Sequence, residues 1–299
     1  KEIMSSTINI MEVGLRDGLQ IVDKFISTQK KLDLISGFID SGIKNIQVTS
    51  FVNPDKVPQT SDAESLVKQL PIVDNIEYSA LIFNRKGMER AIYSGINKVE
   101  TSISLSPTYN KKNLGMSVDQ SIRNLRKVIQ FGLENNIDIR AGLQCVWGCP
   151  YEGLIDHSII IKKISKIIEM GPARISLCDT SGMANPREIS SLLDLIYKTF
   201  PGIYLSLHFH NTYGMGLVNL FQALQFDIKE IDTSFGGIGG SPYIKNSKGN
   251  IATEDTIYML ENMGYKTGMD INKISILSNK LEKIIGSSYF SGQIYKTIK

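Results

Sequence analysis

Residues 30 to 52 read KKLDLISGFIDSGIKNIQVTSFV, and this stretch carries the pattern that decides the fold. Up to Gly42 the apolar residues recur at the spacing of one helix face, which predicts a helix. After the glycine, residues 45–52 are rich in β-branched side chains, which predicts a strand. The repeating unit is therefore a helix, a glycine break and a strand.

The same alternation runs along the whole chain. Runs rich in β-branched residues predict eight strands, at 7–13, 45–52, 76–83, 98–105, 138–146, 174–180, 204–210 and 230–235. Amphipathic stretches, such as 121–136, lie between them and predict helices. Eight strands that alternate with helices indicate parallel pairing, and a closed (β/α)8 TIM barrel of the α/β class is the commonest arrangement of eight. An open doubly wound sheet is the alternative.

The chain length agrees with one barrel, because this fold typically needs roughly 250 residues and the chain has 299. We expect a single domain over 1–299, with the barrel at about 7–265. The helical period continues past the eighth strand, so a C-terminal helical extension is expected over about 266–299.

The composition excludes several classes of protein. Hydrophobic residues make up 42% and charged residues 21%, as in ordinary folded proteins. The net charge of +3 comes from 33 basic and 30 acidic residues without a long basic run, so no nucleic-acid partner is expected. No apolar run is long enough for a membrane span, and the first residues, KEIMSSTINI, lack a signal-peptide core, so we expect a cytoplasmic protein without membrane association. The three cysteines form no CxxC pair and are expected to be buried thiols.

Active sites of TIM barrels lie at the carboxyl ends of the strands. Polar residues occupy several of these ends, although they come from distant parts of the sequence. They are Arg16 and Asp17 after the first strand, Asp179 at the sixth, His208 and His210 at the seventh, and Ser241 and Asn250 in the loop after the eighth. The barrel brings them to one rim. Asp179 has two readings, as a helix cap or as a residue that positions substrate.

The pair in "HFH" is the most informative feature of this rim. Side chains two apart on a strand point to the same face, so His208 and His210 are expected to project together into the barrel mouth. Two hydrogen-bonded structural histidines are the alternative. With Asp17 and Asn250 they form a mixed nitrogen and oxygen set, which suits a divalent ion, Mg or Mn rather than a structural zinc, with positions left for substrate.

Seven motifs in order resemble one family. They are "VGLRDGLQ" (13–20), "TSFVNPDKVPQ" (49–59), "GCPYEG" (148–153), "ISLCDTSG" (175–182), "HFHNTYG" (208–214), "GGIGGSPY" (236–243) and "GNIATED" (249–255). Over roughly residues 7 to 270 the chain resembles 3-hydroxy-3-methylglutaryl-CoA lyase, within the metal-dependent lyase and Claisen-condensation barrels. The resemblance implies a (β/α)8 barrel, a metal site at Asp17, His208, His210 and Asn250, and Arg16 as the catalytic arginine.

The implied reaction explains why opposite charges stand side by side at the end of the first strand. In a retro-Claisen cleavage to acetyl-CoA and acetoacetate, negative charge moves onto a thioester oxygen, where the guanidinium of Arg16 can stabilise it. Asp17 instead holds a cation that acidifies the substrate hydroxyl. Adjacent residues then serve opposite ends of one reaction.

Two positions depart from the family pattern. Ser241 stands where the lyases carry a cysteine for proton transfer, and Gln47 stands where they carry a glutamate near the metal. Two other functions therefore stay open: a related aldolase or Claisen-type synthase that acts on another 2-oxo or hydroxy acid, and a binding homologue with impaired catalysis. The expected partner is a small molecule, an acyl-CoA or a hydroxy or oxo acid. Barrels of this family commonly pair, so a homodimer is also an open expectation.

Overall fold

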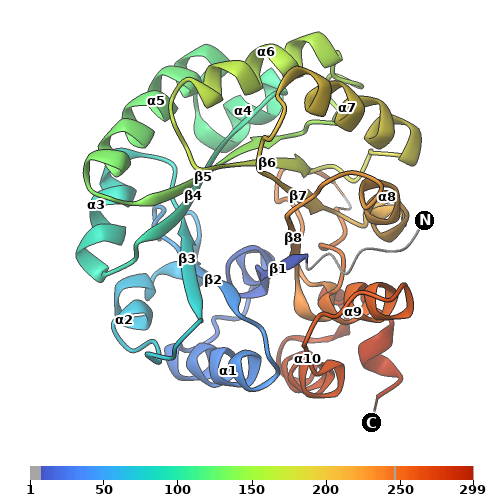
Figure 1. Cartoon of the computed structure of the whole chain (residues 1–299). Helices are drawn as coiled ribbons and strands as arrows, with labels where there is room; N and C mark the ends of the chain where they lie inside the picture. Colours follow the sequence, from blue (N-terminus) through green and yellow to red (C-terminus); the bar gives the residue numbers. More distant parts are fainter. Residues whose placement is uncertain (1–7, 246, 299) are drawn as a thin grey trace.

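The structure is a computed structural model that describes residues 8–245 and 247–298. Eight parallel strands pair in sequence order and close into a barrel, with β8 against β1. Their bounds are β1 Asn9–Glu12, β2 Asn45–Ser50, β3 Glu77–Leu81, β4 Lys98–Ser104, β5 Asp138–Gln144, β6 Arg174–Asp179, β7 Leu205–Phe209 and β8 Glu230–Thr233. Figure 1 shows the helices as an outer ring around these strands. The (β/α)8 barrel expected from the sequence is confirmed.

The helices of the described residues follow the strands in the alternating order that a barrel needs. They are α1 Thr28–Asp40, α2 Ala63–Val67, α3 Arg85–Ser94, α4 Pro107–Leu114, α5 Val118–Glu134, α6 His157–Ile168, α7 Pro186–Thr199, α8 Gly216–Ala223, α9 Thr253–Asn262 and α10 Ile271–Ile285. Local sequence sets their ends. The Ser27 side chain accepts a hydrogen bond from the Lys30 amide at the start of α1, and Ser117 with Gln120 forms a capping box at the start of α5.

Each observed strand lies inside its predicted range and is shorter at one or both ends. The seventh strand, for example, was expected at 204–210 and spans Leu205–Phe209. The extra residues belong to the loops at the two ends of the strands, and those at the carboxyl ends begin the active-site rim. Residues 1–7, which include Thr7 at the start of the first predicted strand, lie outside the described residues.

The hydrophobic core lies between the strands and the ring of helices. Leu207 and Phe209 of β7 belong to it, while the alternate residue His208 faces the inside of the barrel, as the period of two requires. The inside is unusually polar for this fold, which commonly fills it with branched apolar residues. Arg140 on β5 lies there, bonded to acidic side chains of β4 and β8. The barrel therefore carries a charged layer beneath its rim.

Beyond α9 the chain continues into α10, which packs between α9 and α1 (Figure 1). The Asp270 amide donates to the Ser41 carbonyl at 2.8 Å, and Lys273 donates to the Asp40 carbonyl at 3.0 Å. Both contacts attach α10 to the end of α1. In residues 8–245 and 247–298 we find no helix with the length and apolar character of a membrane span.

Candidate active site

A cavity of about 390 Å³ lies at the carboxyl ends of the strands. Five of the residues expected at the site line this cavity: Arg16, Asp17, His208, His210 and Ser241. The fold thus brings together side chains that are more than 200 positions apart in the sequence. A cavity of this size can hold a small organic molecule.

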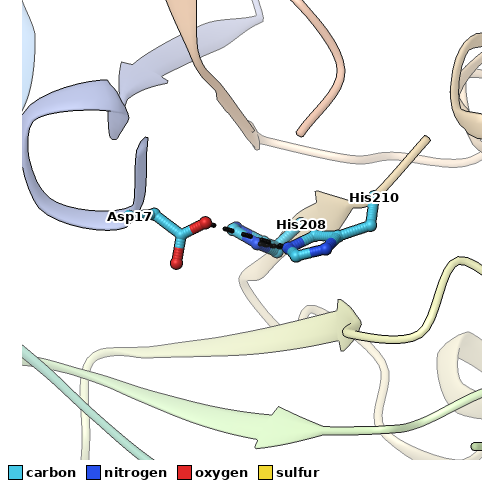
Figure 2. Close-up of side chains that lie close together, drawn as sticks. All are labelled: Asp17, His208 and His210. Carbon is cyan, nitrogen blue, oxygen red and sulfur yellow. Dashed lines mark hydrogen bonds and ion pairs between the residues drawn. The ribbon is translucent and has the colours of Figure 1, made fainter. Parts of the chain in front are cut away.

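Three of these side chains converge on one point. Ligand atoms of Asp17, His208 and His210 all lie within 4.8 Å of one another. The Nε2 atom of His210 lies 3.0 Å from Nε2 of His208 and 3.8 Å from Oδ2 of Asp17. Figure 2 shows the carboxylate directed at the two imidazole rings at the end of β7. One carboxylate oxygen and two imidazole nitrogens in this arrangement fit a divalent cation.

Asn250, the fourth expected ligand, lies beside this group. Its Nδ2 donates to Oδ2 of Asp17 at 2.8 Å and to the Ile238 carbonyl at 3.1 Å. Its Oδ1 is buried without a hydrogen-bond partner among the described residues. A buried acceptor of this kind is costly unless something pairs with it, so the side chain has an oxygen available for a cation.

Asp232 orients the imidazole ring of His208. Its Nδ1 lies 3.0 Å from Oδ2 of Asp232, which leaves Nε2 for the cavity. A carboxylate behind an imidazole in this way fixes the tautomer and makes the ring a better ligand. Arg140 binds both oxygens of Asp232, at 2.6 and 3.0 Å.

The charge states of Asp17 and His210 suit a cation, whereas Asp232 and Asp17 outweigh burial and raise the pKa of His208, which must lose its proton to bind one. Burial disfavours the ionised form of Asp17, but Arg16 and the two histidines outweigh it and lower the pKa of that carboxyl. Burial, helped by the charge on His208, lowers the pKa of His210 to about 3. Asp17 is therefore anionic and His210 neutral near pH 7, which are the protonation states that ligands need.

Arg16 is held at two edges. A single turn of π-helix over Gly14–Gly18 places it next to Asp17. Its Nε donates to Oε1 of Gln47 and its Nη1 donates to Oδ1 of Asp17. Within the described part of the chain, Nη2 makes no hydrogen bond, so this edge of the guanidinium is left for a ligand of the cavity.

Ser241 lies in a loop that depends on glycine. Gly239 and Gly240 have φ angles of +127° and +141°, and a Cβ at Gly239 would lie 2.5 Å from Nδ2 of Asn250. Oγ of Ser241 is 2.9 Å from the Tyr109 hydroxyl and accepts a hydrogen bond from the Tyr243 amide at 3.3 Å. Burial raises the pKa of Tyr109, which keeps its phenol protonated.

Asp179 does not line the cavity with the other residues expected at the site. It is buried and absent from the cavity lining, and its Oδ2 accepts a hydrogen bond from the Ala184 amide at 3.1 Å. The geometry matches neither of its two readings: Asn185 caps α7, and the Asp179 carboxylate braces the loop after β6 instead of facing the cavity. Its neighbour Thr180 lines the cavity instead.

Several buried polar residues of the site were missed in the sequence. They are Tyr109, Glu100, Arg140, Glu230 and Asp232. The signal was present for the last four, because charged residues stand inside β-branched runs, as in "EIDTSF". The same period of two that singled out the histidines would have placed Glu230 and Asp232 inside the barrel.

The fold and this cluster define a TIM-barrel protein with a candidate divalent-metal centre. Comparison with protein families agrees: residues 7–281 match the HMGL-like family model, and the chain belongs to this family. The resemblance drawn from the seven motifs is confirmed.

The following individual relatives are all named as hydroxymethylglutaryl-CoA lyases. The hydroxymethylglutaryl-CoA lyase YngG of Bacillus subtilis is 38% identical over 279 residues, which are 93% of this chain and 93% of that protein. The mitochondrial hydroxymethylglutaryl-CoA lyase of Homo sapiens is 36% identical over 89% of this chain and 82% of its own. A structure of an HMG-CoA lyase from Acinetobacter baumannii in complex with coenzyme A and 3-methylmalate superposes with a TM-score of 0.93 at 32% identity, covering 99% of this chain and 96% of that one.

Proposed function

We propose that this protein is a metal-dependent carbon–carbon lyase that cleaves 3-hydroxy-3-methylglutaryl-CoA to acetyl-CoA and acetoacetate. The observation that carries the proposal is the convergence of Asp17, His208 and His210 beside the guanidinium of Arg16 in one cavity. Relatives named hydroxymethylglutaryl-CoA lyase match over nearly the whole chain and support the same enzyme class.

In this proposal the substrate hydroxyl loses its proton, the bond between C2 and C3 breaks, and the electron pair moves onto the thioester oxygen as an enolate. Arg16 stabilises that charge through the edge that has no hydrogen-bond partner among the described residues. Asp17, His208, His210 and Oδ1 of Asn250 would hold a divalent ion, Mg or Mn, which when bound would lower the pKa of the substrate hydroxyl. In this proposal Ser241, at the position where the lyases carry a cysteine, delivers a proton to the enolate carbon.

The structure with bound coenzyme A supports an acyl-CoA as the class of substrate, because it was obtained with a relative of the same fold. A homodimer and a cytoplasmic location stay predictions. Light scattering of the purified protein tests the first, and cell fractionation tests the second.

The central test is product formation. Purified protein with Mg or Mn and 3-hydroxy-3-methylglutaryl-CoA is expected to form acetyl-CoA and acetoacetate in equal amounts, and EDTA is expected to abolish this activity. Arg16→Ala is the matched control for contaminating lyase. Equal rates of product formation in Arg16→Ala and in the wild type would contradict the proposal.

One further assay distinguishes the two alternative functions. It measures deuterium exchange from solvent into acyl-CoAs and 2-oxo acids. A related aldolase or synthase exchanges deuterium into its own substrate without cleaving 3-hydroxy-3-methylglutaryl-CoA. A binding homologue binds such a ligand without exchange.

A further inference from the structure

Gln47 connects two parts of the site that do not touch each other. It lies on β2 and is fully buried. Its Oε1 accepts a hydrogen bond from Nε of Arg16, and its Nε2 donates to Oε2 of Glu100 at 2.9 Å. By resemblance alone, Gln47 marks the loss of a negative charge. In the structure, that amide leads directly to another carboxylate.

Glu100 lies on β4, is 4% exposed and lines the cavity. Besides the bond from Gln47, its Oε2 accepts one from Nη2 of Arg140 at 2.5 Å. Its charge also acts on the thiol of Cys178 on β6. Oε1 makes no hydrogen bond to the described residues. A carboxylate is therefore present at the floor of the cavity, two strands along from β2.

Arg140 extends the connection. The same guanidinium binds Asp232, which in turn holds Nδ1 of His208. One run of hydrogen bonds thus joins the arginine expected to stabilise the enolate to an imidazole expected to hold the metal.

The chemistry of the amide makes the pair specific. An amide offers one acceptor and one donor end, and here the acceptor meets a guanidinium N–H while the donor meets a carboxylate. A glutamate at position 47 would instead set two carboxylates 2.9 Å apart, and one of them would have to bind a proton. The glutamine at 47 and the glutamate at 100 therefore depend on each other.

We propose that Gln47 and Glu100 form a positioning pair. Glu100 supplies the negative charge and fixes the orientation of the Gln47 amide, and the amide in turn orients the guanidinium of Arg16. Neither residue is a catalytic residue in this proposal. The role in catalysis rests on the proposed lyase function, whereas the pairing itself does not.

Three variants test the pair: Gln47→Glu, the exchange Gln47→Glu with Glu100→Gln, and Gln47→Met. For each variant, the kcat ratio is its kcat for cleavage divided by the kcat of the wild type at the same pH. This ratio is measured from pH 5.5 to 8.5. The Gln47→Glu ratio is expected to fall at least about tenfold as pH rises, because the shared proton is lost and the two carboxylates repel. The exchange restores both hydrogen bonds, so its ratio should stay within about threefold of one at every pH.

Gln47→Met removes both hydrogen bonds without adding a charge, so its ratio is expected to be low and independent of pH. Glu230→Gln is the matched control, since Glu230 also binds Arg140, at 2.6 Å, but is not bonded to Gln47. Its ratio should not vary with pH. A Gln47→Glu ratio that stays near one, or an exchange variant no better than Gln47→Glu alone, would overturn the proposal.

Thermal unfolding of the same variants separates this inference from the proposed function. Relative to the wild type, Gln47→Glu is expected to lose Tm as pH rises, and the exchange variant is not. This result holds even if the wild type fails to cleave the substrate. A pH-dependent loss of Tm with an unchanged kcat ratio would retain the pairing and overturn its role in holding Arg16.

Discussion

Replacing Ser241 with cysteine is the sharpest test of what the protein does. A thiol has a pKa of about 8.5 and can exchange a proton with a carbanion near neutral pH, whereas an alcohol without a strong base partner does so poorly. In the structure the partner of Ser241 is the Tyr109 hydroxyl at 2.9 Å. Burial raises the pKa of that phenol, so it is a weak acid and a poor source of a base.

The expected size of the rate increase follows from the general effect of one acid or base, limited by the space around Ser241. One well-placed acid or base typically changes a rate by about 10² to 10⁴. A sulfur at position 241 would crowd the Tyr109 hydroxyl, because sulfur is larger than oxygen and the contact is already 2.9 Å. We therefore combine Ser241→Cys with Tyr109→Phe and expect cleavage of 3-hydroxy-3-methylglutaryl-CoA to rise at least about tenfold, which is about 1.4 kcal/mol in the barrier.

The assay is the initial rate of acetyl-CoA formation with saturating Mg. Tyr109→Phe alone is the control, since it opens the same space without supplying a thiol and should not raise the rate. If the double variant is no faster than this control, Ser241 is not at the position of proton transfer. If it also slows deuterium exchange into a different acyl-CoA or 2-oxo acid, the serine is adapted to that other substrate.

Three further variants address the metal, the guanidinium and the barrel interior. His210→Ala should lose bound divalent metal by elemental analysis, while His157→Ala, at the one histidine outside the proposed ligand set, should keep it; full occupancy in the first variant contradicts the ligand set. Arg16→Lys should lower kcat far more than it changes KM, because lysine keeps the charge but lacks the planar fork and the reach of the guanidinium; an effect on KM alone would mark a ground-state anchor. Arg140→Met leaves three buried carboxylates without their guanidinium and should cost about 3–5 kcal/mol in urea unfolding, whereas Arg85→Ala at an exposed ion pair should stay within about 0.5 kcal/mol.

The fold was predictable because its signals are local. A run such as 45–52 alternates and is β-branched whatever lies around it, and each observed strand falls inside such a run. The strand ends were less predictable, because the residue at which a chain leaves a ladder depends on the neighbouring strand. His208 and His210 were predictable as a pair for the same local reason.

The supporting residues depend on closure of the barrel. Glu100 and Arg140 stand opposite each other on neighbouring strands, and their contact depends on the register between the two strands, which no single strand reveals. Tyr109 pairs with Ser241 across 132 positions, from a helix that begins after β4. Asp179 shows the opposite case, since a strand-end carboxylate pointed to the site but its hydrogen bond brings it to a loop amide.

The two departures from the family pattern are therefore unequal. At Gln47 the lost carboxylate has a buried counterpart in Glu100, and both ends of the amide are satisfied, so the change is compensated within the barrel. At Ser241 no described residue supplies an acid of thiol strength at the same hydrogen-bond distance, because the partner is a phenol whose pKa is raised. Charge stabilisation by Arg16 is thus expected to be retained, and proton transfer at the loop is the step that should limit turnover. A solvent deuterium isotope effect on kcat that is larger in the wild type than in the Ser241→Cys, Tyr109→Phe variant would follow from this difference, and equal effects would contradict it.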